Sequence, residues 1–518
     1  MRLLLWMLVL SSTRVELAAA AENLWLDAAR ASITSQELHG HVGVLADDML
    51  EGREAGSRGG HAAARYIIKR LEDAAVKPAG TNGTFAQRFQ GRSQNLLATI
   101  EGTDPELQGE TIVIGAHYDH VGYGTRRNSY GPWGFIHNGA DDNASGVATL
   151  LEVIDALVHS GHQPRRTLLF AFWDGEEKGL LGSKHWMRSP TIPIASVRLA
   201  INADMVGRLT NGRIEVIGTR TGAGLRQLMS SAHLSEKAWL DYTWEIKDNS
   251  DHWTFYEANI PSLCIHTGLH DDYHRPSDDV EKINFEGMQE VSRYLLEQIC
   301  ELADVDQLPA FRPAVRQESP SSQKQTEMPL AAIPSRLDFT WQALDEQPSG
   351  LVVKQVSPDG NAAEAGLLVG DRIFAVNDRP LTSEAQLPAA ALASELEITL
   401  AVQRTGATEP IVLRVPLHGN RIRLGLSWRS NDAEPTTVYV TRVIPFSPAA
   451  RAGIKIHDRI YAVNGESSPS QQAMFTRVQE LMDAKAAEIL LRVESRGVLR
   501  DVAVSLGVPA EPARDPTL

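Results

Sequence analysis

Short apolar runs alternate with amphipathic segments over residues 22–306, and this alternation predicts the fold. Four runs, TIVIGA, TLLFAFW, RLAINA and PSLCIH, have the continuous apolar character of buried strands. Residues 59–74 and 147–158 instead carry apolar side chains at helical spacing. Strands that alternate with helices in this way predict an α/β layer fold for this part of the chain.

The alternation ends near residue 306. Residues 307–335 are rich in Pro, Gln and Ser and show no hydrophobic period. Such a composition is typical of a linker. We therefore expect one large domain at residues 22–306 and a separate C-terminal part beyond the linker.

The C-terminal part contains an internal repeat. Residues 356–377 match residues 443–464 at 12 of 22 positions without a gap, at an offset of 87. The same offset aligns LDFTW (337–341) with LGLSW (424–428). The repeat predicts two copies of one small β-rich module, at residues 336–417 and 421–508.

Bulk composition is that of an ordinary folded protein. The chain has 518 residues, of which 43% are hydrophobic and 22% charged, and its formal net charge is -15. A chain of this length is expected to form roughly two to four domains. The negative charge argues against a nucleic-acid partner.

The first residues have the pattern of a signal peptide at 1–21. Arg2 precedes the apolar stretch Leu3–Leu10, and small residues fill Ala18–Ala21. This pattern predicts export, to the periplasm or the medium, with no stable membrane span after signal removal. A retained amphipathic N-terminus is the alternative.

The chain has two cysteines, Cys264 and Cys300, and both lie in apolar segments. An oxidising compartment would permit a disulfide between them. Two buried thiols are the favoured interpretation.

Each strand-like run leads into a short polar group. The groups are HYDH (117–120), DDNASG (141–146), DGEE (174–177), Asp204 in ADMVG, and DDYHRPSDD (271–279). In open α/β sheets the reaction site lies outside the carboxyl ends of the strands, so these distant groups are expected to converge.

Together the groups supply imidazoles and carboxylates but no thiolate, a set that suits Zn²⁺ or another borderline divalent ion. They are too rich in acids for one ion. Three carboxylates, two neutral histidines and a bridging hydroxide would balance the charge of two divalent ions. Such a site makes hydroxide available near neutral pH and polarises a carbonyl.

The motifs HYDHVG, GADDNASG, DGEEKGLLGS, NADMVG and DYHRPSDD, in that order, resemble the signatures of the M28 family of zinc metallopeptidases. The best-known members of that family are secreted aminopeptidases. The resemblance runs from about Glu37 to Ala303, and LADDMLEGREAGSRGG resembles the family's N-terminal region. It implies a mixed-sheet zinc-exopeptidase domain with helices on both faces.

The resemblance also implies the site residues. Asp141 would bridge two Zn²⁺ ions, which are completed by His117 and Asp204 on one side and by Glu177 and His274 on the other. Glu176 would be the general base, taking a proton from the metal-bridging water and later delivering it to the leaving amine. Asp119 would orient the imidazole of His117.

The roles of several neighbouring residues stay undecided. Asp141 is chosen over Asp142 by motif match alone, and both could instead be acids that favour the start of the following helix. Loop or supporting roles are expected for Asp174, His120, His270, Asp271 and Asp272. SDHWTF (250–255) resembles a family segment that lines the site, and a direct role for Asp251 or His252 is undecided.

The repeated modules resemble PDZ domains, which bind an extended C-terminal peptide at a sheet edge and hold its carboxylate with loop N–H groups. In the second copy Gly425, Leu426, Ser427 and Trp428 fit that loop. In the first copy Asp338 replaces the glycine, and its negative charge is expected to disfavour a carboxylate. The second module is therefore the better candidate peptide binder. The alternative is that both modules only pack against the catalytic domain or mediate self-association.

The leading hypothesis is an exported di-zinc aminopeptidase that acts on peptides or proteins. A carboxypeptidase, a dipeptidase or a glutaminyl cyclase is a second hypothesis, but the full five-ligand set argues against a single-zinc cyclase. A third is a peptide-binding adaptor whose hydrolase domain serves only as a scaffold. The intact set of Glu176 and the ligands makes an adaptor the weakest of the three.

Overall fold

The computed structural model describes residues 24–231, 233–343, 350–467 and 470–506. The chain divides into two compact units, of which the first runs to Gln323 and adds residues 432–434 and 496–498, and the second holds most of the remainder. The predicted signal peptide at 1–21 lies outside the described residues. Within the described ranges, no helix is both long and apolar enough to cross a bilayer.

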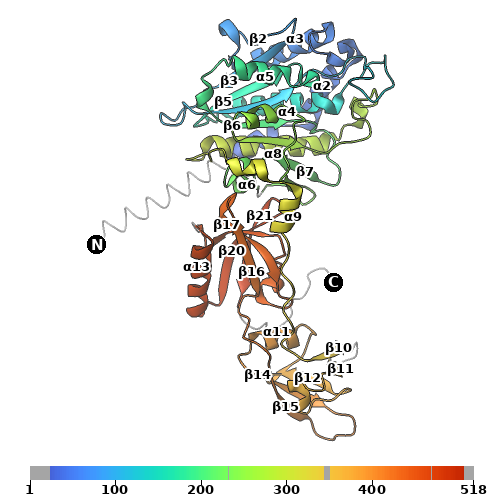
Figure 1. The fold of residues 1–518 in the computed structure, drawn as a ribbon, viewed down its shortest axis with the longest axis vertical. Helices are drawn as coiled ribbons and strands as arrows, with labels where there is room; N and C mark the ends of the chain where they lie inside the picture. The colour runs from blue at the N-terminus through green and yellow to red at the C-terminus, as the bar shows by residue number, and fades with distance from the viewer. Residues whose placement is uncertain (1–23, 232, 344–349, 468–469, 507–518) are drawn as a thin grey trace, which may run out of the picture. The chain divides into compact units, whose positions relative to one another are not determined.

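The first unit is built on a mixed nine-stranded sheet (Figure 1). Its strand order is β1-β3-β5-β4-β6-β9-β7-β8, and β2 pairs with β3. The strands are β1 (Lys77–Pro78), β2 (Ala86–Arg88), β3 (Gln94–Ile100), β4 (Thr111–His117), β5 (Thr167–Trp173), β6 (Val197–Ala203), β7 (Arg213–Ile217), β8 (Trp239–Thr243) and β9 (Ser262–His266). Strands β5, β4, β6 and β9 are parallel, while β3 is antiparallel to β5 and β7 to β9.

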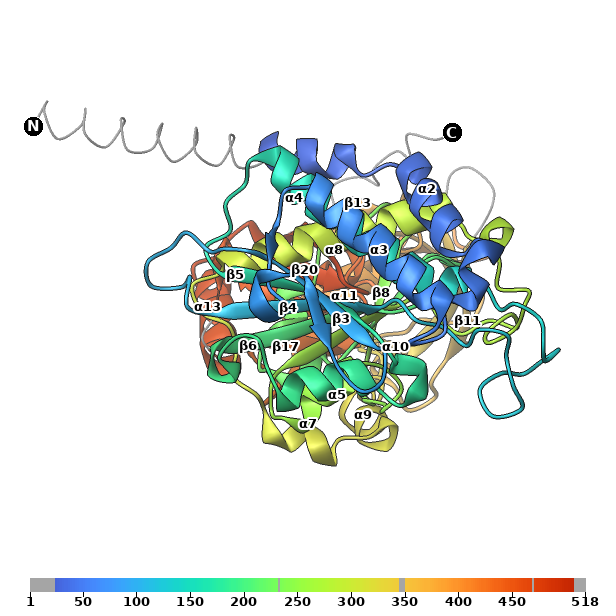
Figure 2. The same cartoon turned by 90° about the horizontal axis from the view of Figure 1, so that it is seen from above.

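Helices cover both faces of this sheet, as Figure 2 shows, with α2, α3, α4 and α8 on one side and α5 and α7 on the other. The helices of this unit are α2 (Ser35–Leu45), α3 (Arg58–Asp73), α4 (Gly146–Ser160), α5 (Leu181–Arg188), α6 (Leu225–Leu228), α7 (His252–Glu257) and α8 (Phe285–Asp304). The α/β fold with helices on both faces, predicted from the sequence, is confirmed.

The burial of both faces of β5 explains why its apolar run is continuous. Successive side chains of a strand point to opposite faces of the sheet. Leu168 and Phe170 belong to the core beneath α4 and α8, whereas Leu169 and Trp173 belong to a second core with Trp186 of α5. Both faces of β5 are therefore buried, as its composition predicts.

The parallel strands place their carboxyl ends along one edge of the sheet. The chain passes from β4 through α4 to β5 on one side of β4, and later to β6 on the other side. Such a reversal of strand order leaves a crevice at the carboxyl ends of the strands, where ligands of open α/β sheets bind. The loops that follow β4, β5, β6 and β9 all begin at this edge.

Both cysteines of the chain are buried and free. Cys264 lies in β9 and Cys300 in α8. The prediction of two buried thiols is confirmed.

The segment predicted as a linker is only partly a linker. Residues 313–317 form a 3-10 helix, and residues 320–326 form α9 (Pro320–Thr326). The guanidinium of Arg316 lies 4.6 Å from the ring centroid of Tyr256, and Glu318 pairs with Arg220. These contacts attach the first half of the segment to the first unit, although its Pro- and Ser-rich composition carries no hydrophobic period.

The second unit contains two modules with the same topology. Their sheets have the orders β10-β11-β12-β14-β15 and β16-β17-β18-β20-β21, with β13 paired to β12 and β19 to β18. The first module comprises β10 (Phe339–Ala343), β11 (Leu351–Val356), α10 (Asn361–Glu364), β12 (Arg372–Val376), β13 (Arg379–Pro380), α11 (Gln386–Ala393), β14 (Glu397–Gln403) and β15 (Ile411–Pro416). The second comprises β16 (Leu426–Asn431), β17 (Glu434–Val443), α12 (Pro448–Arg451), β18 (Arg459–Val463), β19 (Glu466–Ser467), α13 (Gln471–Asp483), β20 (Glu488–Ser495) and β21 (Val498–Ser505).

The repeat extends to irregular detail. The pairing of β12 with β14 shifts register between Ile373 and Ala375, and the pairing of β18 with β20 shifts between Ile460 and Ala462. These positions are again 87 residues apart. The internal repeat found in the sequence therefore corresponds to one fold used twice.

The two modules differ at the start of their first short helix. In the second module Gly425 has a φ of 86°, and a Cβ there would lie 2.1 Å from the Cβ of Ser447. Ser447 caps α12, its hydroxyl accepting a hydrogen bond from the Ala450 amide. In the first module glycine stands at the serine position, as Gly360, and the carboxylate of Asp338 accepts the Ala362 amide instead at 3.2 Å. The glycine and the capping side chain have exchanged places.

This exchange gives Asp338 a structural role in addition to the effect expected from its charge. Its carboxylate caps α10, so its presence is explained without any effect on a peptide carboxylate. A Cβ on Gly360 would lie 2.2 Å from Asp338 Oδ2, so the glycine provides the space that the aspartate fills. The negative charge of Asp338 stays at the loop, so the prediction that the second module is the better candidate peptide binder stands as a prediction.

We expect Asp338→Gly to destabilise α10 by about 1 kcal/mol, the usual effect of losing a helix N-cap. Adding Gly360→Ser should restore most of that loss, because the serine reproduces the arrangement of the second module. Hydrogen exchange of residues 361–364 in the full chain measures both the loss of stability and its recovery. Unchanged protection in Asp338→Gly would contradict the capping role.

Candidate metal centre

Four predicted ligands and the predicted general base follow the parallel strands of the first unit. His117 is the last residue of β4, Glu176 and Glu177 follow β5, Asp204 follows β6 and His274 lies in the loop after β9. Since these strands are parallel, all five side chains start from the same sheet edge. The convergence expected from the sequence is present in the structure.

An irregular turn at residues 140–145 brings further carboxylates to this edge. The side chain of Asn143 ties the turn to the end of β6: its amide donates to the Ala203 carbonyl at 2.9 Å, and its oxygen accepts the Met205 amide at 3.1 Å. The turn leads directly into α4. Asp142, next to Asn143, is thereby held close to Asp204.

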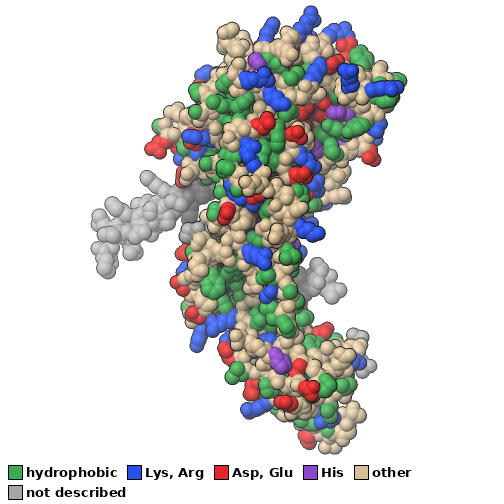
Figure 3. All heavy atoms as spheres, in the orientation of Figure 1, with side chains coloured by type: hydrophobic (Ala, Val, Ile, Leu, Met, Phe, Trp, Pro, Cys, Tyr) green, Lys and Arg blue, Asp and Glu red, His purple; other side chains and the backbone are tan. Residues whose placement is uncertain are grey.

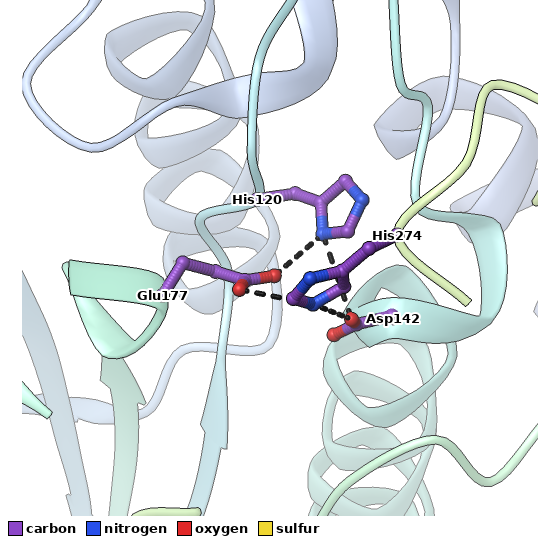
Figure 4. Close-up of side chains that lie close together, drawn as sticks. All are labelled: His120, Asp142, Glu177 and His274. Atoms are coloured by element: carbon purple, nitrogen blue, oxygen red, sulfur yellow. Dashed lines mark hydrogen bonds and ion pairs between the residues drawn. The ribbon is translucent and has the colours of Figure 1, made fainter. Parts of the chain in front are cut away.

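Four side chains form a first group, and Figure 4 shows them pointing toward one another: His120, Asp142, Glu177 and His274. His274 Nε2 lies 3.0 Å from Asp142 Oδ2 and 3.1 Å from Glu177 Oε2. His120 Nδ1 lies 2.7 Å from Glu177 Oε1. The spacing is suitable for one metal ion among these ligand atoms.

A second group consists of His117, Asp142 and Asp204. His117 Nε2 lies 3.3 Å from Asp142 Oδ1 and 3.4 Å from Asp204 Oδ1. Asp142 thus faces the second group with Oδ1 and the first with Oδ2. A carboxylate shared in this way has the arrangement of a ligand that bridges two ions.

The structure corrects the choice of Asp141 as the shared carboxylate. Asp141 Oδ1 accepts the Gly207 amide at 2.6 Å and the Ser145 hydroxyl at 3.1 Å, and Oδ2 lies 3.1 Å from His270 Nε2. Its oxygens are therefore occupied by protein partners, and Asp141 belongs to neither group. The shared position is held by Asp142, the alternative that the motif left open.

His120 was expected only in a supporting role, yet its ring belongs to the first group. The residue is 1% exposed, and its Nδ1 faces the carboxylate of Glu177. The available signal was the second histidine of HYDH, three residues after His117. In an extended strand that spacing would turn the two rings to opposite faces, but β4 ends at His117.

Asp119 supports the site through both its backbone and its side chain. His117 Nδ1 lies 3.1 Å from the Asp119 carbonyl oxygen and 3.8 Å from its carboxylate, so the backbone group fixes the imidazole. A hydrogen on Nδ1 leaves Nε2 of His117 available as a ligand atom. The Asp119 carboxylate accepts the Glu176 amide at 3.0 Å and so positions that residue.

The SDHWTF segment contributes a residue that sequence reasoning missed. The Ser250 hydroxyl donates to Asp204 Oδ2 and so orients that carboxylate. Asp251 and His252 are buried at the start of α7 but belong to neither group. Burial raises the pKa of Asp251 to about 6 and lowers that of His252 to about 4.

Arg53, from the EGR sequence of the N-terminal region, holds the loops of the site together. Its guanidinium is buried and donates to four backbone carbonyls, those of Tyr118, Leu45, Asn138 and Gly139. Tyr118 follows His117, and Gly139 begins the turn that carries Asp142. Burial lowers the pKa of Arg53 to about 10, partly offset by Asp142 and Asp278.

The charges of the cluster shift its pKa values strongly. Burial raises the pKa of Glu176 well above its usual value, and the nearby Glu177 raises it further. Burial alone would lower the pKa of His117, but Glu176 and Asp204 raise it well above its usual value. Burial alone would also lower the pKa of His274, but the close carboxylates of Asp142 and Glu177 raise it to about 11. The carboxylates of this cluster thus stabilise the protonated, positively charged forms of His117 and His274.

The donor set fits a divalent metal. Two buried ligand atoms, Asp204 Oδ1 and His274 Nε2, have no hydrogen-bond partner among the described residues and face the groups. Unpaired buried polar atoms are costly, so they indicate a missing partner. Imidazole and carboxylate ligands without a thiolate suit Zn²⁺ and related ions.

The first unit is therefore an α/β domain with a candidate metal centre at its sheet edge. Two overlapping groups of imidazoles and carboxylates form that centre. Comparison with family models makes this more specific. Residues 95–299 match Peptidase family M28, and residues 352–404 and 413–494 each match a PDZ domain. The chain therefore contains an M28 peptidase domain and two PDZ domains, which confirms both resemblances.

Curated relatives are similar to less than half of this chain. A probable leucine aminopeptidase of Arthroderma otae is 27% identical over 254 residues, 46% of this chain and 65% of the relative. Leupeptin-inactivating enzyme 1 of Streptomyces exfoliatus is 28% identical over 232 residues, 45% of this chain and 48% of the relative. The chain thus spans less than two thirds of the length of these relatives.

Solved structures of aminopeptidases cover about half of the chain. The LapA aminopeptidase of Legionella pneumophila has 22% identity and a TM-score of 0.44, covering 54% of this chain and 75% of that one. The aminopeptidase of Aneurinibacillus sp. strain AM-1 has 16% identity and a TM-score of 0.43, covering 55% of this chain and 97% of that one.

The residues predicted for the second PDZ domain's binding loop lie where β16 begins, at the edge of its sheet. Gly425 precedes the strand, and Leu426, Ser427 and Trp428 are its first three residues. The Gly425 carbonyl accepts the Ile444 amide at 2.9 Å. The loop is thus fixed on the side of β17.

Proposed function

We propose that this protein is a metallopeptidase that binds two Zn²⁺ ions and releases N-terminal residues from peptides. The observation that carries the proposal is Asp142, whose two oxygens face two separate groups of ligand atoms. His117 and Asp204 would complete one ion. Glu177 and His274, with His120 beside them, would complete the other.

The mechanism assigns different tasks to the two adjacent glutamates. When bound, the zinc pair would supply a water acidic enough to attack near neutral pH and would polarise the scissile carbonyl. Glu176 accepts a proton from the attacking water, since its raised pKa makes it an effective base near neutral pH. It then delivers that proton to the nitrogen of the leaving amine as the carbon–nitrogen bond breaks. Glu177 stays with the ligands.

The surroundings of the site support a peptidase that acts at a free N-terminus rather than at a free C-terminus. Among the described residues, no Lys or Arg side chain forms an ion pair with any member of the two groups. Arg53, behind the site, donates to backbone carbonyls. A carboxypeptidase needs a positive side chain for the substrate carboxylate, and no Lys or Arg in the described part of the chain pairs with these groups to supply one. The name of one curated relative, a probable leucine aminopeptidase, agrees with release from the N-terminus.

An exposed aromatic segment that begins at Tyr130, next to His274, supports a preference for apolar peptides. The Tyr130 amide donates to the His274 carbonyl at 3.1 Å, and the two rings lie 6.4 Å apart. Tyr130, Trp133 and Phe135 are 64%, 48% and 61% exposed. Aromatic surface of this kind would contact apolar side chains of a bound peptide.

Matched peptides with free and acetylated N-termini test the proposed activity. The zinc-loaded protein should release the first residue from the free peptide and leave the acetylated one intact. Equal cleavage of both would contradict an aminopeptidase, and cleavage only from the carboxyl end would favour a carboxypeptidase.

Zinc binding should release about two protons near pH 7, because imidazoles must be neutral to bind a metal. The raised pKa values of His117 and His274 mean that both rings carry protons before the metal arrives. Zinc affinity should therefore fall as the pH falls. Calorimetry in two buffers of different ionisation enthalpy measures the release. A binding enthalpy independent of the buffer would contradict the expectation.

We propose in addition that one or both PDZ domains bind the carboxyl end of a peptide. The open edge strands β10 and β16 support this, since each has a neighbour on one side only in its sheet. Gly425→Asp is not a clean probe, because Gly425 packs directly on Ser447. Full-length protein should instead bind a labelled peptide and lose affinity when its carboxyl end is amidated. Equal binding would contradict carboxylate recognition.

Export is proposed from the sequence of residues 1–21. The protein would then act in the periplasm or the medium. Fractionation of cells that express the full chain tests this, with N-terminal sequencing of the product. Retention of Met1 on all of the protein would contradict signal cleavage.

A further inference from the structure

The first unit carries a second feature at the same sheet edge, a basic groove. It has a volume of about 960 Å³ and lies between α3 and the segment that leads through β2 into β3. Its charged lining consists of Arg65, Arg88, Arg92 and His61, and no Asp or Glu lines it. Figure 3 shows Lys and Arg side chains over the region that Figure 1 labels β2 and α3. A local excess of positive charge stands out in a protein of net charge -15.

The three arginines of this groove are exposed and form no ion pair with a carboxylate among the described residues. Elsewhere on α3 the basic side chains do have such partners: Lys69 pairs with Asp73, and Arg70 with Asp155. The groove therefore presents cationic side chains that the fold leaves available.

The groove adjoins the candidate metal centre. Gln94, in its lining, opens β3, and β3 is antiparallel to β5. The start of β3 thus lies beside the carboxyl end of β5, which carries Glu176. The Gln94 amide donates to Asp174 Oδ2 at 2.9 Å, and its carbonyl accepts the Tyr118 hydroxyl at 2.7 Å. The groove wall is thus bonded to two of the loops that carry site residues, those after β5 and β4.

We propose that this groove binds an acidic segment of the peptide substrate, downstream of the bond that is cleaved. The inference rests on the proposed peptidase function and names a substrate class for it. Three unpaired guanidinium groups attract carboxylates, and the uncharged Thr81, Asn82 and Thr84 in the same lining offer hydrogen bonds to a peptide backbone. Because the groove wall is hydrogen-bonded to the loop that carries Glu176, a peptide that starts at the metal centre can extend toward the groove, advancing roughly 3.3 Å per residue.

The test compares peptides that differ only downstream. Each begins with the same apolar residue and carries either three glutamates or three glutamines from the fourth position on. The full-length, zinc-loaded protein is compared with the variant R65Q/R88Q/R92Q. A matched control, R379Q/R414Q/K485Q, removes the same charge from exposed positions of the PDZ domains.

The wild type and the control should prefer the glutamate peptide by about tenfold in kcat/KM at low salt, mainly through KM, and lose the preference in 0.5 M NaCl. The groove variant should cleave both peptides alike. All three proteins should hydrolyse a single-residue leucine anilide at the same rate, because it cannot reach the groove.

Other outcomes overturn the inference. A wild-type protein without a preference, or a groove variant that retains it, would show that the groove does not read acidic substrates. Binding of wild type but not of the groove variant to phosphatidylglycerol vesicles, with no peptide preference, would assign the groove to an anionic lipid surface instead. A wild-type protein that cleaves neither the anilide nor the peptides would refute the proposed function itself.

Discussion

Glu176→Gln should lower kcat for peptide hydrolysis by about 10³-fold while leaving the zinc content unchanged. General-base catalysis contributes about 10²- to 10⁴-fold, and glutamine cannot accept the proton. Glu176 belongs to neither ligand group, so its loss removes no metal ligand. Steady-state kinetics on a free peptide, with metal analysis of the same sample, measure both effects.

The adjacent residue supplies the matched control. Glu177→Gln removes a ligand that faces both His120 and His274, and it should therefore lose zinc as well as activity. Adjacent side chains point in different directions here, so the two glutamates cannot exchange roles. Zinc loss in Glu176→Gln, or retention in Glu177→Gln, would reverse the assignment.

Asp142→Asn should release most of the bound zinc and reduce activity by at least about 100-fold, since the lost carboxylate faces both groups. Asp141→Asn should retain the metal. Its effect should be a loss of stability of about 1–3 kcal/mol, because the Gly207 amide and the Ser145 hydroxyl lose a charged acceptor.

Metal analysis and thermal unfolding of these two neighbouring variants separate a ligand from a structural acid. If Asp141→Asn lost its zinc while Asp142→Asn kept it, the motif-based choice would be right and the assignment from geometry wrong.

The sheet and the convergence of the site were predictable, because continuous apolar runs mark strands buried on both faces and each run ends in polar residues. The choice between Asp141 and Asp142 was not. Both lie in an irregular turn, and the hydrogen bonds of Asn143 and Gly207 decide which carboxylate faces the metal groups. The partners in these bonds, Ala203, Met205 and Gly207, lie outside the turn, so the turn sequence alone does not show which carboxylate they select.

Contacts between distant segments were also beyond the sequence. The capping role of Asp338 depends on Gly360, 22 residues later, and becomes visible only once both are compared with Gly425 and Ser447. The polar composition of residues 307–318 predicts a linker, yet ion pairs and ring contacts rather than a hydrophobic period attach them to the first unit. Composition alone does not reveal such attachment.

The central claim is a zinc pair that shares Asp142. Crystals of the zinc-loaded protein, measured on both sides of the zinc absorption edge, test it most directly. The account predicts two anomalous peaks, one within contact of His117 and Asp204 and one within contact of Glu177 and His274, with an Asp142 oxygen bound to each. A single peak, or two peaks that Asp142 does not join, would contradict it.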